Sequence, residues 1–180
     1  MPVVWYFAYG SNMQRATFSG RRGIEARRAR AARVDGWRIV FDKPTVLPSR
    51  HGVANLVRAD AEAVLGVLYE ITADDLAHVH LTEGVLIGSY ERLTVEAVPL
   101  DDGAAPVAAH TLFSSRRAAT LAPSRRYMAL LIEGAEEHGL PAWYVDRLRA
   151  VPAVDDSAED LALRAQVDDA LRAMRRGDGR

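Results

Sequence analysis

Hydrophobic residues in the first two-thirds of the chain occur in short runs with the period of β-strands. Residues 3–9 are rich in β-branched and aromatic side chains and end at Gly10-Ser11-Asn12, which predicts a strand leading into a loop. Asn12 is predicted to cap a short helical turn over residues 13–18. Further strands are predicted at residues 37–41, 53–57, 64–71 (interrupted at Gly66), 90–98 and 107–113, the last two pairing antiparallel.

From Ser124 onward, hydrophobic residues recur with the period of an α-helix. Ser124 is a candidate N-cap and Gly139 a stop signal, so we predict a helix between them. A second helix is expected to begin near Pro141 and a third to cover residues 157–175, with residues 177–180 frayed. Earlier in the chain, Thr72-Ala73-Asp74-Asp75 has the form of a capping motif and predicts a short helix that ends before Glu83.

This order of elements predicts an α+β fold, because strands dominate the first two-thirds, helices form the last third and no β-α-β alternation appears. Five or six short strands could close into a small barrel, which would leave no exposed sheet edge. Within the 180 residues there is no internal repeat and no low-complexity linker. We therefore expect one domain over residues 1–180, with its core at about residues 3–151.

Composition and charge exclude several classes of function. The sequence has no cysteine, which rules out disulfides, zinc–thiolate sites and thiol nucleophiles. A net charge of −1 provides no overall field that would attract nucleic acid. No apolar run approaches the ~20 residues that span a bilayer, and the first residues lack the pattern of a signal peptide, so a cytoplasmic location is expected. The sequence gives no prediction of oligomeric state.

A local cluster of arginines lies in residues 21–33. It has no interleaved aromatic residues on which bases could stack, so a solvated surface segment is the favoured interpretation over a phosphate or nucleic-acid site. The histidines give no metal signal either, since His78 and His80 are two residues apart and would not share a helix face. Neither group is taken as a functional cue.

Two features are candidates for chemistry. Gly10 and Ser11 follow a strand, where released backbone N–H groups can gather around an anion or a carbonyl oxygen, although a tight turn would have the same residues. Ser11 lacks the Gly-x-Ser-x-Gly context of a nucleophile. Glu83 lies in an apolar stretch, where it is either a solvated residue at a helix end or an enclosed carboxylate suited to proton transfer.

Six short motifs, taken together, resemble those of the γ-glutamyl cyclotransferase-like family. They occur in family order over about residues 4–151, and six motifs at suitable spacing are specific although each alone is weak. They are Tyr6-Phe7-Ala8-Tyr9-Gly10-Ser11-Asn12-Met13, Gly66-Val67-Leu68-Tyr69, Glu83-Gly84-Val85, Gly88-Ser89-Tyr90, Pro123-Ser124-Arg125-Arg126-Tyr127 and Gly134-Ala135-Glu136-Glu137-His138-Gly139-Leu140-Pro141.

The resemblance implies a mixed β-barrel flanked by helices and a small-molecule γ-glutamyl substrate, with no metal or organic cofactor, no nucleic acid and no membrane. It implies that Glu83 is the general acid/base that cyclises a γ-glutamyl amide to 5-oxoproline. The substrate-binding residues that it implies are Tyr6, Phe7, Ala8, Tyr9, Gly10, Ser11, Tyr90 and Tyr127. The leaving amine would contact residues 14–33 and 42–52, and its identity stays open, as does a ligand-binding role without turnover.

One position departs from the family pattern, which has an aspartate three residues before the catalytic glutamate. His80 occupies that position here. Two interpretations are open: His80 lies near Glu83 and changes its titration, or it points to solvent from the short helix.

Overall fold

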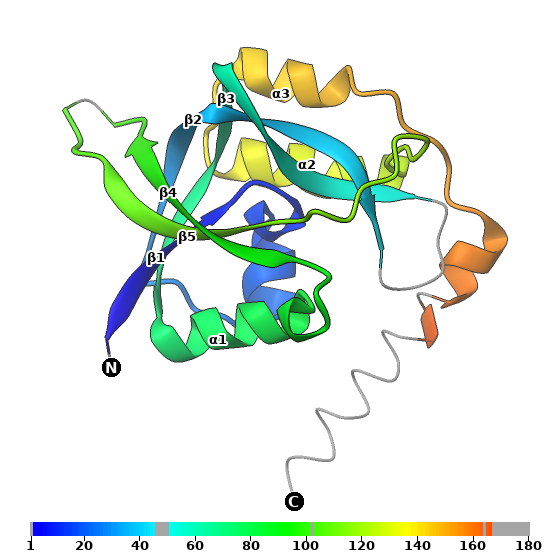
Figure 1. Cartoon of the computed structure of the whole chain (residues 1–180), viewed down its shortest axis with the longest axis horizontal. Helices are drawn as coiled ribbons and strands as arrows, with labels where there is room; N and C mark the ends of the chain where they lie inside the picture. Colours follow the sequence, from blue (N-terminus) through cyan, green and yellow to red (C-terminus); the bar gives the residue numbers. More distant parts are fainter. Residues whose placement is uncertain (1, 46–50, 102, 164, 167–180) are drawn as a thin grey trace, which may run out of the picture.

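The computed structural model describes residues 2–45, 51–101, 103–163 and 165–166 (Figure 1). Its strands form a closed barrel in the order β1-β3-β2-β4-β5, in which the pairs are antiparallel except β1 and β5, which run parallel where Tyr6 meets His110. The predicted α+β fold with a small mixed barrel is confirmed. The strands are β1 (Val3–Ala8), β2 (Arg28–Pro44), β3 (Gly52–Thr72), β4 (Glu91–Pro99) and β5 (Val107–Phe113).

The strands β2 and β3 form one long hairpin, which the sequence predicted only in pieces. The two strands predicted at residues 53–57 and 64–71 are both part of β3, and β2 begins at Arg28 instead of residue 37. Register shifts between Asp35 and Trp37 and between Val40 and Lys43 break the alternation of side chains, so no single period runs through β2. Gly66 does not interrupt β3, because a Cβ there would lie 2.2 Å from Ala8 O and the glycine lets β1 and β3 approach closely.

The helices α1 (Ala73–Thr82), α2 (Arg125–Glu137) and α3 (Ala142–Arg149) begin where the sequence signals predicted. Thr72 and Asp75 form a complete capping box before α1, and the Ser124 hydroxyl accepts a hydrogen bond from the backbone of Tyr127 at the start of α2. Residues 158–163 are helical, whereas residues 164 and 167–175 of the third predicted helix and the predicted frayed end lie outside the described residues.

Short helical segments fill the remaining connections: η1 (Ser11–Met13), the π-helix η2 (Ala16–Arg21) and η3 (Val85–Ile87). The prediction that Asn12 caps this region is wrong, because Gly10 precedes η1 and the Asn12 side chain makes no capping hydrogen bond. In the part of the chain that the structure describes, no helix has the length and apolar character needed to cross a membrane.

Helices on two sides of the barrel bring the ends of distant segments together. Figure 1 shows α2 and α3 side by side on one side of the barrel and α1 on the opposite side. The segment after β1 packs tightly under α2, since a Cβ on Gly134 would lie 2.5 Å from Gln14 N. The loop at residues 9–12 is therefore held between the barrel and two helices.

Candidate active site

A cavity of about 200 Å³ opens between the end of β1, the C-terminal end of α1 and the first turn of α2. Pockets for drug-sized ligands have about 300–1,000 Å³, so this cavity suits a smaller metabolite. The residues that line it are Tyr6, Tyr9, Gly10, Ser11, Asn12, Lys43, Thr45, Val53, Ala54, Thr82, Glu83, Ser89, Tyr90, Leu112 and Tyr127.

Glu83 enters the cavity from the C-terminal end of α1. Its backbone N–H donates to Val79 O at 2.9 Å, and Gly84 then takes a φ of +72°, a left-handed conformation that glycine adopts without strain. The helix ends there, and the Glu83 side chain is only 19% exposed. Of the two environments that the sequence allowed, the enclosed one is observed.

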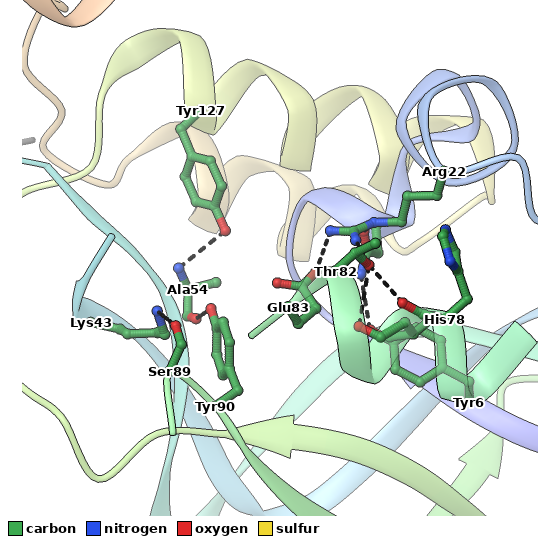
Figure 2. A network of polar contacts seen from close by, with 12 residues as sticks. Tyr6, Arg22, Lys43, Ala54, His78, Thr82, Glu83, Ser89, Tyr90 and Tyr127 are labelled. Atoms are coloured by element: carbon green, nitrogen blue, oxygen red, sulfur yellow. Dashed lines mark hydrogen bonds and ion pairs between the residues drawn. The ribbon is translucent and has the colours of Figure 1, made fainter. Parts of the chain in front are cut away.

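Two donors from the segment after β1 hold the Glu83 carboxylate. Asn12 Nδ2 donates to Oε1 at 3.0 Å, and the Arg22 guanidinium forms an ion pair with the same oxygen (Figure 2). Arg22 Nε also donates to Asn12 Oδ1 at 2.7 Å, which fixes the two donors relative to each other. Hydrogen bonds from the described residues reach Oε1 alone, so Oε2 keeps its acceptor sites for a ligand.

The contacts of Arg22 correct the interpretation of residues 21–33 as a solvated surface segment without function. Arg22 is 15% exposed and also contacts Thr82 Oγ1, so it joins the segment after β1 to the end of α1. Residues from Arg28 onward belong to β2, where Ala32 and Val34 are buried in the core. The sequence missed both facts because charge dominates the composition of this stretch and conceals its alternation.

Tyr127 and Tyr90 both line the cavity and both form hydrogen bonds with the backbone of Ala54. Tyr127 Oη accepts from Ala54 N at 3.1 Å, and Tyr90 Oη donates to Ala54 O at 2.8 Å. Burial raises the pKa of Tyr127 to about 12, although hydrogen bonds from Ala54 and Ser11 lower it, and burial also raises the pKa of Tyr90. Both hydroxyls therefore stay protonated near neutral pH.

The loop after β1 lines the cavity with its later residues only. Tyr9, Gly10 and Ser11 face the cavity, whereas Phe7 is 0% and Ala8 1% exposed and neither is among the residues that line it. Gly10 has a φ of −111°, so its role is to leave space: a Cβ there would lie 3.2 Å from Tyr127 Oη. The backbone of the loop thus lies directly against Tyr127.

Tyr6 is buried, and its hydroxyl reaches the cavity beside Glu83. Its Oη accepts from Asn12 Nδ2 at 3.0 Å, and burial and the charge of Glu83 raise the Tyr6 pKa well above its ordinary value. The Tyr9 hydroxyl instead donates to Leu112 O at 2.6 Å, across the barrel. Of these two tyrosines, Tyr9 uses its hydroxyl proton within the wall, whereas the hydrogen bond between Tyr6 and Asn12 uses the Tyr6 oxygen as an acceptor.

Lys43, the only lysine in the sequence, lines the cavity although the sequence did not single it out as a candidate for chemistry. It is 3% exposed, and its ammonium donates to Pro44 O at 2.9 Å and to Ser89 Oγ at 3.0 Å. It also lies 4.2 Å from the centre of the Tyr90 ring. A strand pattern does not predict it, because the register shift next to Lys43 decides where its side chain points.

His80 is not among the residues that line the cavity. Burial lowers the pKa of His80, and the neighbouring charges that lower it further are Arg92 and His110, on β4 and β5. Among the described residues, no group of His, Asp and Glu side chains is arranged to hold a metal ion.

The fold is that of γ-glutamyl cyclotransferases. A solved structure of a γ-glutamyl cyclotransferase superposes with a TM-score of 0.74 at 22% identity, over 92% of this chain and 99% of that one. The model of the AIG2-like family matches residues 63–148.

Relatives with similar sequences carry the same name. The γ-glutamyl cyclotransferase aclK of Aspergillus oryzae is 30% identical over 166 residues, which cover 82% of this chain and 60% of that protein. Human γ-glutamylcyclotransferase is 28% identical over 153 residues, 83% of this chain and 79% of that protein. The chain thus spans less than two thirds of the length of the fungal relative. Its recognition as a γ-glutamyl cyclotransferase-like protein is confirmed.

Proposed function

We propose that this chain converts a γ-glutamyl amide into 5-oxoproline and a free amine. The observation that carries the proposal is the Glu83 carboxylate, held by Arg22 and Asn12 through one oxygen at the wall of a small cavity. The names of the relatives support the same reaction. A carboxylate that is fixed and partly enclosed is the kind of group that transfers protons in catalysis.

The reaction needs no nucleophile from the protein, because the substrate's own α-amine attacks its γ-carbonyl carbon. The protein has to hold the glutamyl chain in a folded conformation, and well-oriented intramolecular reactions reach effective molarities of about 10⁵–10⁸ M. The cavity walls come from β1, β3, α1 and α2, which are fixed to one another by the barrel and by the packing of η1 under α2. These walls would impose the folded conformation.

Glu83 would act first as a base and then as an acid. Its free oxygen takes a proton from the substrate's ammonium group, since a protonated amine cannot attack. The same oxygen then delivers this proton to the amide nitrogen as the C–N bond breaks. The attacking nitrogen gives up its second surplus proton to the departing amine, so that the products are the lactam of 5-oxoproline and an ammonium group. Because Arg22 and Asn12 both bind Oε1, Oε2 can serve both steps without a change in the position of the carboxylate.

Donors around the loop would stabilise the negative charges of the substrate. The backbone N–H groups near Gly10 and Ser11 and the protonated hydroxyls of Tyr6 and Tyr127 lie along the same cavity. They would bind the oxyanion that forms on the γ-carbonyl or the α-carboxylate of the glutamyl group. Phe7 and Ala8 have no place in this proposal, because their side chains are in the core.

The test is incubation with a panel of γ-glutamyl amides that differ only in the amine, with 5-oxoproline measured by chromatography. The panel includes γ-glutamyl amino acids, γ-glutamyl alkylamines and the γ-glutamyl amide of the lysine side chain. Release of 5-oxoproline from any member above the uncatalysed rate is the expected result. Saturable binding without release from any of them would instead assign a ligand-binding role.

A further inference from the structure

The barrel is closed between β2 and β4 over a very short distance. Residues 32–33 of β2 pair with residues 98–99, the last two of β4. Along residues 91–97, β4 pairs with β5 on one side, and within the described residues it has no strand partner on the other side. The backbone N–H and C=O groups of an unpaired strand edge are available to pair with another strand.

A cavity of about 290 Å³ separates β2 from β4 beyond the two paired residues. It is lined by residues 93–96 of β4 and by Val34, Asp35 and Trp37 of β2. Consecutive side chains point to opposite faces of a strand, so a cavity that consecutive residues line lies along the strand edges. A register shift between Asp35 and Trp37, where Gly36 has a φ of +77°, bends β2 at this point. The edge of β4 is therefore open where β2 leaves it.

The side chains along this open edge alternate between two faces of β4. Arg92, Thr94 and Glu96 are exposed on one face, whereas Leu93 is half-buried and Val95 buried on the other. In the part of the chain that the structure describes, neither Arg92 nor Glu96 forms an ion pair or a side-chain hydrogen bond. The edge thus carries one cation and one anion that the chain does not use to bind itself.

These two charges are placed symmetrically about Thr94, which is also the midpoint of the unpaired residues 91–97. If a second β4 pairs antiparallel about this midpoint, Arg92 lies opposite Glu96 of the second copy, and the reverse contact forms as well. A register centred on Leu93 or on Val95 would instead place a charged residue opposite Thr94. Opposite charges directly across two strands stabilise the pair, and like charges destabilise it.

The apolar face matches in the same register. Leu93 of each copy lies opposite Val95 of the other, so both faces of the paired strands have compatible neighbours. An edge with two like charges would repel a second copy, which is how many exposed edges avoid association. The edge of β4 has the opposite character.

We propose that the open edge of β4, residues 91–97, is a docking surface for a second copy of this chain, with the two strands antiparallel about Thr94. Both copies contribute the same residues to such an interface, so the contact between Arg92 and Glu96 forms twice. The sheet then continues across the two-fold axis in the order β5-β4-β4-β5. Neither Arg92 nor Glu96 lines the candidate active site, and this inference does not depend on the proposed reaction.

The experiment measures molar mass by light scattering after size-exclusion chromatography, over a range of protein concentrations. The wild-type chain is expected to reach twice the 19.7 kDa of one copy. Arg92→Glu and Glu96→Arg each place like charges opposite one another at both symmetric contacts, which should raise the dissociation constant of the dimer by about tenfold. The double variant with both reversals restores opposite charges and should recover the dimer.

Arg27→Glu is the matched control, because it reverses the charge of an exposed arginine that precedes β2 and should leave the dimer unchanged. A wild-type chain that stays monomeric at every concentration up to its solubility limit would overturn the proposal. A dimer that survives both single reversals would place the interface elsewhere on the surface. Loss of the dimer in the single variants without recovery in the double variant would reject the register centred on Thr94.

Discussion

Replacement of Glu83 by glutamine tests the centre of the proposed mechanism. Glutamine has nearly the same shape, and its side-chain oxygen can still accept from Asn12 Nδ2 and Arg22 in place of Oε1. The amide nitrogen then occupies the position of Oε2, where it can neither take a proton from the substrate amine nor return one to the leaving group. The cavity keeps its shape and loses its acid/base.

The expected loss of activity is much larger than the expected loss of stability. Removal of a general acid/base lowers the rate by about 10²–10⁴-fold, or about 3–5 kcal/mol of transition-state stabilisation. The ion pair is partly enclosed, with side chains 15% and 19% exposed, and a neutral acceptor remains for Arg22. We therefore expect a loss of about 1–2 kcal/mol in stability, which for a chain of this size lowers Tm by about 2–8 °C.

The assay measures 5-oxoproline release at substrate concentrations well below and well above KM, together with a thermal unfolding curve for the same preparation. Glu96→Gln is the matched control, since Glu96 is an exposed glutamate on β4 that does not line the cavity. The control should keep wild-type turnover. If Glu83→Gln keeps a kcat near that of the wild-type chain, Glu83 is not the acid/base. If the variant loses activity only because it unfolds, its thermal unfolding curve will show no folded baseline at the assay temperature.

Three further predictions follow from other contacts. In Gly10→Val the new Cβ would lie 3.2 Å from Tyr127 Oη and 3.3 Å from Ala54 Cβ. The valine should therefore abolish the rise in Tm that bound 5-oxoproline gives the wild-type chain. An unchanged rise in Tm would contradict a ligand role for the loop. His80→Asp should leave the acidic limb of the kcat/KM profile in place, because the neighbouring charges that act on His80 are Arg92 and His110; a shift to higher pH would show coupling to Glu83. Burial lowers the pKa of His138 from its ordinary value of 6.5, so on acidification the unfolded chain binds a proton before the folded chain does. The free energy of unfolding should therefore fall as the pH drops through 6.5. Urea titrations at about pH 5–7.5 measure this slope, and His138→Gln should flatten it.

The sequence predicted the elements whose signals are local and missed the extent of those set by pairing. The N-caps at Thr72 and Ser124 are short-range motifs, and both helices begin where the motifs place them. The strand β2 begins earlier than predicted because its first residues are arginines and alanines, which have low strand propensity and are held there by antiparallel pairing with β3. The bounds of such a strand depend on a pairing partner distant in the chain, and the pattern of hydrophobic residues within the strand itself does not show that partner.

Within the site, the residues identified by the family motifs are brought together, with Phe7 and Ala8 as the exceptions. Tyr6, Tyr9, Gly10, Ser11, Glu83, Tyr90 and Tyr127 all line the cavity. Strand geometry explains the two exceptions: both residues lie inside β1, where neighbouring strands cover them, and the chain becomes accessible only where β1 ends. The continuous motif in the sequence therefore covers the loop that lines the cavity together with part of the strand that supports it.

Arg22 and Lys43 show a limit of composition as a guide to function. Twenty-three basic residues are distributed along this chain, and nothing local separates Arg22 or Lys43 from the solvated ones. What separates them is enclosure: Arg22 is 15% exposed and contacts the end of α1, and Lys43 is 3% exposed and follows a register shift in β2. Their contacts differ: Arg22 forms an ion pair with Glu83, whereas the hydrogen bonds of Lys43 go to uncharged groups. The Arg22–Glu83 pair fixes the position of the carboxylate that we propose as the acid/base, whereas Lys43 is held by Pro44 O, Ser89 Oγ and the Tyr90 ring.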